Sequence, residues 1–420
     1  MLAGRYRWVV CALLFFATTI NYVDRQILSL LKPMLDSELG WTNEEFGRVN
    51  AAFQAAYAVG LLAFGALVDR VGTKVGYALS IAMWSAAAMG HALVRGLSGF
   101  FDARIALGLG EGGNFPSAIK TVAHFFPLGE RAAATAIFNS GANVGAIVAP
   151  AVVPWLAFRF GWRSAFVAAG VAGFVWLAFW LAAFDPSRGT DDAGASLAVP
   201  APAPTLPALL RHRQTWSFIV AKLLTDPVWW FFLIWLPDYF KKTRGLSIKD
   251  SWVHLVTIYG IVTALGIAGG WWSGFLARRG FSISTARKLA LVTFACTVLS
   301  IFGVTRAGPW TAVVLIGVAG ASHQAWSANL FTSVSDMFPK GAVASVVGLG
   351  GMAGSLGGIA FPIYAGHLLD RFGARGDAAA GYAVLFAICG TAYLAAFVLN
   401  HLLAPRFEPF EPKLPASSTP

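Results

Sequence analysis

Long apolar stretches recur along the chain and are separated by short polar or charged segments. A helix that spans a bilayer needs about 20 largely apolar residues, and twelve stretches of the chain are roughly this long. We therefore predict an all-α membrane protein with twelve transmembrane helices, whose even number places both termini on the same side. The expected helices cover residues 7–31, 45–68, 75–95, 98–121, 132–157, 163–184, 214–240, 252–277, 287–306, 309–333, 342–369 and 380–404.

One long segment without apolar periodicity divides these stretches into two sets of six. Residues 185–213 are rich in Pro, Ala and acidic residues, and such a composition does not pack a core. We predict an N-terminal six-helix bundle over 1–184, a cytoplasmic linker over 185–213, a C-terminal six-helix bundle over 214–404 and a tail over 405–420.

The two sets share a pattern of Gly and Pro at a constant offset of 212 residues. The matching positions are Pro127, Gly129, Gly145, Pro150 and Gly161 in the first set and Pro339, Gly341, Gly357, Pro362 and Gly373 in the second. Chance coincidence in a Gly-rich chain is the alternative. Two parallel six-helix repeats are a known plan for transporters, with the substrate site between them near the middle of the bilayer.

The composition supports the membrane assignment. Of 420 residues, 57% are hydrophobic and 12% are charged, whereas soluble domains have about 25% charged residues. The 33 Phe and 16 Trp residues suit lipid-facing and interfacial positions. A soluble protein of this length could not cover so much apolar surface.

The formal net charge of +11 does not indicate a nucleic-acid partner. Basic residues fall in short groups between apolar stretches, such as Arg278-Arg279, and we interpret them as membrane-flanking charges. Their slight excess on the side of the termini favours cytoplasmic termini. The basic group at 241–249 argues in the other direction.

No residue pattern indicates an enzyme or a metal site. The cysteines Cys11, Cys296 and Cys389 lie within apolar stretches and show neither metal-ligand nor disulfide spacing, and the seven histidines show no ligand spacing. The apolar stretch after Arg5 and Arg7 is longer than a signal-peptide core, so we expect it to be the first membrane span.

Ionisable residues inside an apolar stretch are the strongest functional signal. Asp24 and Arg25 are adjacent in the first stretch, and a membrane interior tolerates such groups only where they face protein or water. Asp24 is able to hold or release a proton, and Arg25 is able to bind an anion. We expect a proton-coupled anion site here.

A second acid–base pair lies in the fourth stretch. Arg104 and Glu111 are seven residues apart, which is two helical turns, and Asn114 continues that face. A buried Arg–Glu pair is structural if it only neutralises itself. The functional interpretation is a gate in which a proton on Glu111 frees Arg104 to bind a carboxylate.

Aromatic and amide side chains are candidates for the walls of the cavity. Tyr57 suits a hydrogen bond to a sugar hydroxyl or an anchor at the interface. In the tenth stretch His323, Trp326 and Asn329 recur every three residues, with Gln324 beside them. We expect this face to meet the cavity, where Trp326 suits stacking on a sugar ring. Core packing is the alternative for Trp326, and a simple hydrogen-bonding role is the alternative for His323.

Two further features have structural or functional interpretations. Lys222 and Asp226 are four residues apart and are expected to pair, with a structural role preferred. In residues 65–74, GALVDRVGTK, Asp69 and Arg70 lie near a helix end and are expected to form a breakable latch between helices. An ordinary surface turn is the alternative.

The same string resembles the loop signature of the major facilitator superfamily, Gly-x-x-x-Asp-Arg-x-Gly-x-Lys, and the segments 104–111 and 141–150 resemble its fourth- and fifth-helix motifs. The segments 21–25 (NYVDR), 110–116 (GEGGNFP) and 225–230 (TDPVWW) resemble the anion:cation symporter family, with particular likeness to bacterial hexuronate transporters.

This resemblance implies proton-driven uptake of sugar acids such as glucuronate and galacturonate. The roles that it implies are proton coupling for Asp24 and Glu111, substrate-anion binding for Arg25 and Arg104, and cavity lining for Tyr57 and Trp326. Family members for aldonates carry a Gln near Ala142 and an Asn near Gly351, which this chain lacks.

We therefore expect a proton:hexuronate symporter of a bacterial inner membrane. Its substrate site would comprise Arg25, Arg104, Tyr57, Asn114, Gln324, Trp326 and Asn329. It needs no cofactor beyond the proton gradient, and its partners are a small organic anion, protons and the lipid bilayer. We expect it to function as a monomer. Transport of another organic anion, an aldonate, dicarboxylate or aromatic acid, is the alternative, and a membrane enzyme or a receptor fits the sequence less well.

Overall fold

The computed structural model describes residues 2–40, 43–189, 205–245 and 248–409, and within these ranges every regular element is a helix. Much of the predicted linker (190–204) and of the predicted tail (410–420) lies outside the described residues. The all-α prediction is confirmed. Helices are expected for such apolar segments, because a helix satisfies its own backbone hydrogen bonds inside a bilayer.

The long helices follow the predicted stretches closely. Those of the first part of the chain are α1 (Leu2–Leu39), α2 (Asn43–Val71), α3 (Thr73–Gly90), α4 (Leu97–Glu111), α5 (Asn114–Phe125), α6 (Arg131–Phe160) and α7 (Trp162–Ala183). Those of the second part are α8 (Leu206–Leu209), α9 (Arg213–Arg244), α10 (Ile248–Arg278), α11 (Ile283–Thr297), α12 (Pro309–Met337), α13 (Val343–Gly373) and α14 (Ala378–Leu403). Short 3₁₀ helices cover His91–Leu93, Pro186–Arg188 and Val298–Gly303.

Eight helical segments of the described chain are long and apolar enough to cross a membrane by composition alone. They are α1, α2, α6, α7, α10, α11 with the 3₁₀ helix after it, α13 and α14. The remaining predicted spans correspond to α3, the α4–α5 pair, α9 and α12. Of these, α4–α5, α9 and α12 carry buried polar or charged side chains, which lowers their hydropathy and brings chemistry into the interior.

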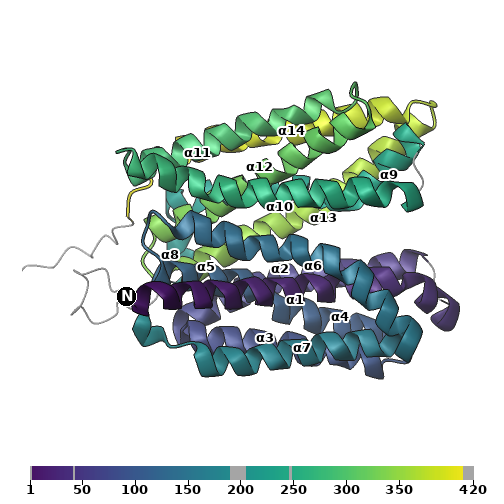
Figure 1. Ribbon diagram of the computed structural model, residues 1–420, viewed down its shortest axis with the longest axis horizontal. Coiled ribbons are helices and arrows are strands. Elements are labelled where there is room, and N and C mark those ends of the chain that lie inside the picture. Colours follow the sequence, from purple (N-terminus) through teal and green to yellow (C-terminus); the bar gives the residue numbers. More distant parts are fainter. Residues whose placement is uncertain (1, 41–42, 190–204, 246–247, 410–420) are drawn as a thin grey trace, which may run out of the picture.

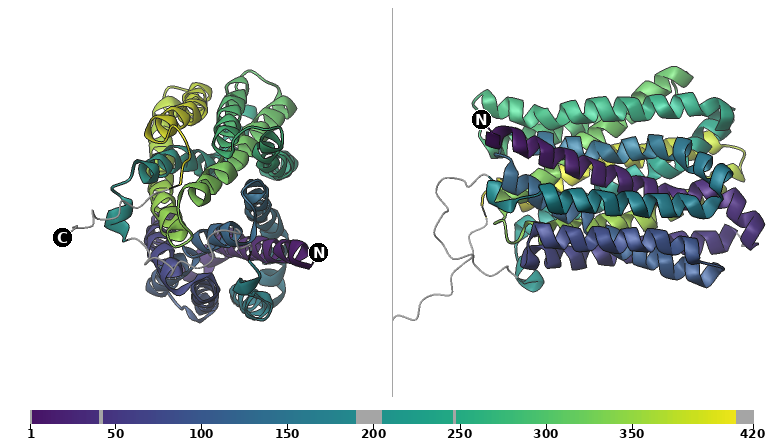
Figure 2. Two further views of the ribbon diagram at one scale, coloured as in Figure 1. Left: turned by 90° about the vertical axis from the view of Figure 1, so that its left-hand side faces the viewer. Right: turned by 60° about the horizontal axis from the view of Figure 1, so that its bottom comes forward.

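The helices form two groups that follow the order of the chain (Figure 1). We call α1–α7 the N-half and α9–α14 the C-half. Within the N-half α1 packs on α6, α2 on α4 and α3 on α7, and within the C-half α9 packs on α13 and α14, and α10 on α12. The halves contact each other mainly through α2 with α13 and α6 with α10, and also through α6 with α12 and α5 with α12 and α13. Figure 2 includes a view along the helices, with the two halves facing each other.

The helix bounds repeat at the offset found in the sequence. Helices α6 and α13 begin at Arg131 and Val343, 212 residues apart, and each contains a proline inside the helix, Pro150 and Pro362. The pair α4–α5 spans 97–125, and α12 spans 309–337 at the same offset. Helix α1 begins and α14 ends at the same end of the molecule, which we call the terminus end (Figure 1).

Single glycines make the shortest connections. Gly72 joins α2 to α3 with φ 82°, and Gly161 joins α6 to α7 with φ 83°. Because a side chain strains this left-handed backbone, glycine allows one helix to follow another without a longer loop. The predicted loop signature at 65–74 is therefore the end of α2, this turn and the start of α3.

The fourth predicted stretch forms α4 and α5, with a break at Gly112 and Gly113, both of which keep right-handed helical backbone angles. Gly112 lies against the backbone of Gly60 and Leu61, where no Cβ would fit. The hydroxyl of Ser80 donates to the Gly110 carbonyl at 2.7 Å and satisfies an acceptor near the break.

Candidate functional site

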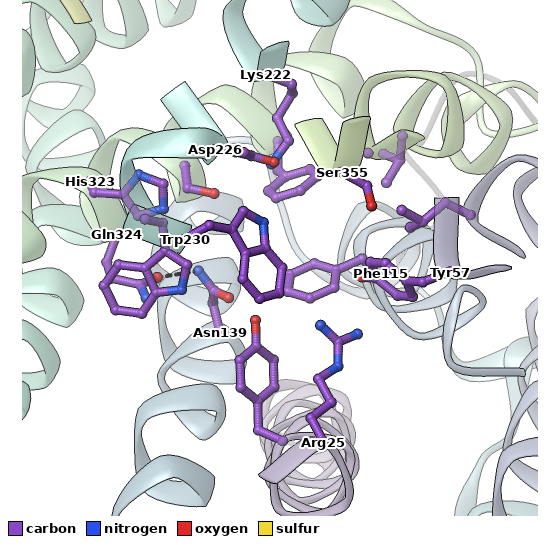
Figure 3. Close-up of a pocket in the computed structure, with 17 residues that line it drawn as sticks. Arg25, Tyr57, Phe115, Asn139, Lys222, Asp226, Trp230, His323, Gln324 and Ser355 are labelled. Carbon is purple, nitrogen blue, oxygen red and sulfur yellow. Dashed lines mark hydrogen bonds and ion pairs between the residues drawn. The ribbon is translucent and has the colours of Figure 1, made fainter. Parts of the chain in front are cut away.

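A cavity between the two halves is the candidate site (Figure 3). It holds about 630 Å³ of empty space, a volume that includes open solvent. The N-half lines it with Tyr22, Arg25, Tyr57, Leu61, Phe115 and Asn139. The C-half lines it with Lys222, Asp226, Trp229, Trp230, His323, Gln324, Ser327, Phe331, Val347, Gly351 and Ser355.

Arg25 is the cation of the N-half wall. Its guanidinium lies over the ring of Tyr57, with 4.3 Å from Cζ to the ring centroid, and near the ring of Tyr22 at 5.0 Å. The planar guanidinium suits aromatic stacking and carboxylate binding at once. Arg25 and Tyr57, both predicted substrate residues, therefore lie together on the cavity wall.

Glu111 forms an ion pair with Arg25 and does not itself line the cavity. The Nε of Arg25 donates to Oε2 of Glu111 at 2.7 Å, and the Glu111 side chain is fully buried. The predicted pairing of Arg104 with Glu111 is not made in this structure. Glu111 is the last residue of α4, and its carboxylate meets Arg25 of α1 instead.

Asp24 and Arg104 are buried beside this ion pair but share no hydrogen bond with it. Each is 1% exposed. Both carboxylate oxygens of Asp24, and Nε and Nη2 of Arg104, have no hydrogen-bond partner among the described residues. The charges that act on Asp24 are those of Glu111, Arg104 and Arg25, so the four groups form one electrostatic cluster. A buried polar group without a partner is costly, and such groups are candidates for a functional role.

Neither Asp24 nor Arg104 lines the cavity. Arg25 alone connects the cavity to the cluster, because it lines the cavity and also contacts Glu111. An anion that reaches Arg25 from the cavity thus meets a cation whose other partner is a buried acid.

On α12 the face toward the cavity differs from the predicted one. His323, Gln324, Ser327 and Phe331 line the cavity, whereas Trp326 does not. Successive residues of an α-helix are about 100° apart, so steps of three drift by about 60° while steps of four stay closer to one face. The predicted series therefore rotates away from the cavity after His323.

Trp326 and Asn329 are packed behind the wall. Trp326 is fully buried and meets Tyr393 edge-on, with ring centroids 5.6 Å apart. Asn329 is fully buried and donates to the Ala325 carbonyl at 2.9 Å. A direct contact of either side chain with a substrate in this cavity would need the helix to rotate.

Asn114 is likewise turned away from the cavity. Its Oδ1 accepts a hydrogen bond from the Tyr77 hydroxyl, and its Nδ2 donates to Thr18 at 3.4 Å. Glu111 and Asn114 both contact α1, through Arg25 and Thr18, so the two side chains lie on one face of the α4–α5 pair. Asn114 holds α5 against α1 and α3 in this structure.

Sequence reasoning underestimated α9. Trp229 and Trp230 line the cavity, and Trp229 stacks on His323 at 5.2 Å between ring centroids with 5° between the planes. His323 also shares a hydrogen bond between Nδ1 and the Tyr393 hydroxyl. The signal for these tryptophans was their position directly after the polar Thr225-Asp226-Pro227 interruption of an apolar stretch.

Lys222 and Asp226 form the predicted ion pair, with Nζ and Oδ2 2.6 Å apart. Both residues line the cavity. The Lys222 ammonium also lies 4.1 Å from the centroid of the Phe331 ring.

A hydrogen bond crosses the cavity between the halves. The Nδ2 of Asn139, on α6, donates to Oε1 of Gln324, on α12, and Gln324 donates to Asn143 at 3.5 Å. Gln324 is a predicted substrate residue and lines the cavity, whereas sequence reasoning did not single out Asn139. An amide at Asn139 is not distinguishable in sequence from one that packs in a core.

Asp69 spans the two halves at the terminus end. Its Oδ2 accepts from the Ser345 N–H at 2.6 Å and its Oδ1 from the Ala344 N–H at 3.3 Å, so it caps the first turn of α13. Lys120 donates to Asp69 Oδ1 at 2.8 Å. A carboxylate is favoured at a helix N-terminus, because free N–H groups and the helix dipole meet there. The other predicted latch residue, Arg70, is exposed.

A second set of contacts joins the halves at the terminus end and involves residues that the sequence did not single out. Arg131, at the start of α6, donates through Nη1 to the Ser335 carbonyl at 2.7 Å and lies 3.6 Å from Asp336. Arg287, on α11, donates to Asp336 at 3.0 Å and to the Leu128 carbonyl at 2.7 Å. These charges lie at the ends of apolar stretches, where they resemble ordinary membrane-flanking residues.

Comparison with known proteins identifies the family. The model of the Major Facilitator Superfamily matches residues 14–362. The hexuronate transporter of Escherichia coli (strain K12) is 29% identical over 388 residues, which cover 87% of this chain and 88% of that protein. A probable galactarate/D-glucarate transporter of Bacillus subtilis (strain 168) is 30% identical and covers 87% of this chain and 86% of its own.

Solved structures share the fold. The structure of a proton:xylose symporter with bound 6-bromo-6-deoxy-D-glucose has a TM-score of 0.73 and 14% identity, and the match covers 96% of this chain and 97% of that one. The structure of the E. coli fucose:proton symporter has a TM-score of 0.67, 14% identity and coverages of 95% and 99%. At this identity the likeness concerns the fold alone.

Proposed function

The chain belongs to the Major Facilitator Superfamily, and from this premise we propose that it carries hexuronates such as glucuronate and galacturonate into the cell together with protons. At the coarser level it is a multi-pass membrane transporter of organic acids and not an enzyme. The observation that carries the proposal is the position of Arg25, which faces the cavity and is held from behind by Glu111 at 2.7 Å.

The substrate carboxylate binds Arg25. A guanidinium binds a carboxylate through paired N–H donors, so the incoming anion competes with Glu111 for the same cation. Tyr57 and Gln324 contribute contacts from opposite halves, and the tryptophans of α9 provide apolar surface for a sugar ring. The names of the relatives support a sugar acid, since they include a hexuronate transporter and a D-galactonate transporter.

Coupling follows from the competition for Arg25. When Glu111 takes a proton it loses the charge that holds Arg25, and the substrate carboxylate replaces it. Asp24 is the second coupling acid, because a carboxyl without a cationic hydrogen-bond partner avoids the cost of a buried charge when it is protonated. Loss of the protons on the other side of the membrane restores the Arg25–Glu111 pair and expels the anion. Substrate and proton thus favour each other's binding.

The remaining predicted site residues do not line the cavity and act on the site indirectly. Arg104 balances the charge of Asp24 and Glu111 in the cluster. Asn114, Trp326 and Asn329 position the helices that carry the site. The bundles 1–184 and 214–404 are the bodies that move around the substrate, and Asp69 is part of the latch that releases when they do.

The setting completes the proposal. The chain works as a monomer in a bacterial inner membrane with both termini in the cytoplasm, and the proton gradient is its only source of energy. The arrangement of α1 and α14, whose outer ends lie together, is compatible with this topology (Figure 1).

Uptake of labelled glucuronate into proteoliposomes tests the proposal. An imposed gradient, acidic outside, should drive accumulation, and Arg25→Gln should abolish it. Uptake no greater than in liposomes without protein would contradict the hexuronate assignment.

A second candidate substrate class is favoured by one finding. The 30% identical relative is named for galactarate and D-glucarate, which are dianions of the same size as hexuronates. Competition of unlabelled glucarate against labelled glucuronate distinguishes the two classes.

A further inference from the structure

The Lys222–Asp226 pair has no part in the coupling scheme, yet it lines the cavity. It comes from α9 of the C-half, and Figure 3 shows it on the side of the cavity opposite Arg25, with Trp230 between them. A substrate whose carboxylate binds Arg25 thus presents its other end to this pair.

The two members of the pair are not equally accessible. The Lys222 side chain is 6% exposed and is enclosed between Asp226 Oδ2 at 2.6 Å and the Phe331 ring. The Asp226 side chain is 18% exposed. The member that a substrate meets is therefore the carboxylate, while the lysine holds it from behind.

The carboxylate is also held in place from a second helix. Gly354 of α13 lies against Asp226, and a Cβ at that position would collide with Oδ2. Asp226 is thus fixed by Lys222 on one side and by the α13 backbone on another. A fixed acceptor in a cavity wall selects the chemical groups that are able to donate to it.

We propose that Asp226 is the specificity determinant of the site and selects monoanionic sugar acids against dianionic ones. An ionised carboxylate only accepts hydrogen bonds, so it binds the hydroxyl groups at the end of a hexuronate remote from its own carboxylate. An aldarate places a second carboxylate there, where the two negative charges repel each other. Lys222 reduces this repulsion but does not remove it, because the ammonium is enclosed behind the more exposed carboxylate that the substrate meets first. Repulsive elements of this kind commonly carry specificity.

The inference rests on the proposed transport of hexuronates and adds the part of the site that distinguishes them from aldarates. The inference argues against transport of aldarates, the second candidate substrate class, because an aldarate transporter would need a free cation at the remote end of the cavity. In this structure that cation is neutralised by Asp226.

Glucuronate and glucarate are the pair of probes, since they differ in whether the remote end carries a carboxylate. In wild-type proteoliposomes unlabelled glucuronate should inhibit labelled glucuronate uptake at a concentration at least about tenfold lower than glucarate does. In Asp226→Asn the lysine is released to bind the second carboxylate, so the two inhibitory concentrations should approach within about threefold. Asp226→Glu keeps the charge and should keep the preference.

The control is Asp102→Asn, which makes the same chemical change at an exposed position of α4 and should leave the preference unchanged. Equal inhibition by both acids in the wild type overturns the inference, even where Asp226→Asn does not fold. An unchanged preference in folded Asp226→Asn overturns it as well. Absence of any hexuronate uptake by the wild type would refute the proposed function, which is a different result.

Discussion

At the scale of single residues, the site separates groups that meet the substrate from groups that meet only each other. Arg25 faces the cavity, whereas Asp24, Arg104 and Glu111 lie behind it and are buried. Buried ionisable groups in a membrane protein are retained where they have a function. Of the four residues of this cluster, Arg25 is the one that lines the cavity, so in the proposed function it connects the bound anion to the coupling acids.

Arg25→Lys tests whether the guanidinium geometry matters beyond the charge. A lysine has no planar fork and cannot contact Glu111 and a carboxylate while it stacks on Tyr57. We expect glucuronate binding to weaken by at least about tenfold, measured as the loss of substrate-induced thermal stabilisation. Arg163→Lys is the control, because Arg163 forms a half-exposed surface pair with Glu38 and should behave as wild type. Unchanged binding by Arg25→Lys would contradict the assigned role.

Substitution of two tryptophans distinguishes a residue that lines the cavity from one that packs in the core. Trp230→Ala removes a ring from the cavity wall and should weaken substrate binding by about tenfold, with a smaller effect on stability. Trp326→Ala removes a fully buried ring and should lower the free energy of unfolding by about 3–5 kcal/mol. Thermal melting and substrate titration of both variants give the comparison. The opposite pattern would restore Trp326 as a cavity residue.

At the scale of elements, the break between α4 and α5 lies against α2 at Gly112. On either side of this break Glu111 meets Arg25 and Asn114 contacts Thr18, both of which are on α1. Glycines on α13 likewise lie against α9. Because glycine has no side chain, Gly354 leaves room for Asp226 and Gly358 leaves room for the ring of Trp230. Close helix contact through small residues is common in membranes, and here it also positions the cavity wall.

Gly112→Ala should disturb this break. A Cβ at Gly112 would collide with the backbone of Gly60 and Leu61, which has no room to move. Overpacking of this kind costs about 1–3 kcal/mol, so the melting temperature should fall and the Arg25–Glu111 pair should be displaced, with loss of transport. Gly90→Ala is the matched control, since nothing lies within 4 Å of a Cβ there. Equal stability and transport for both variants would show that the break tolerates a side chain.

At the scale of the whole molecule, the halves are fastened at the terminus end by two sets of contacts. Asp69 caps α13 across the interface, and the Arg131, Arg287 and Asp336 group joins α6 to α11 and α12. A transporter of this fold exposes its central site to one side of the membrane at a time by moving one half against the other. Contacts at one end must therefore break in each cycle.

Asp69→Ala should loosen the terminus end. Removal of a helix cap costs about 0.5–2 kcal/mol, and here the cap also joins the halves. We expect spin labels on Val75 and Lys340, both exposed at this end, to show a longer or broader distance distribution than in the parent protein. Asp377→Ala is the control, because Asp377 caps α14 within the C-half alone. An unchanged distribution in Asp69→Ala would remove Asp69 from the latch.

Much of the fold was predictable because apolar length is a strong signal in membrane proteins. Each predicted stretch coincides with a helix or a helix pair, and the Pro and Gly repeat marks α6 and α13 correctly. The close approach of α2 to Gly112 was not predictable, because it depends on how helices that are distant in sequence pack in space. Trp326 was assigned to the cavity on the family resemblance and on a spacing of three, which drifts around a helix.

The most direct test of the central claim measures proton movement with substrate. Proteoliposomes that contain a pH-sensitive dye should show glucuronate-driven proton uptake with the wild-type protein. Glu111→Gln should lower this signal to at most the part carried by Asp24, while it still exchanges labelled for unlabelled glucuronate, because a neutral side chain leaves Arg25 available but carries no proton. Glucuronate-driven proton uptake that persists in Glu111→Gln at the wild-type level would contradict the account.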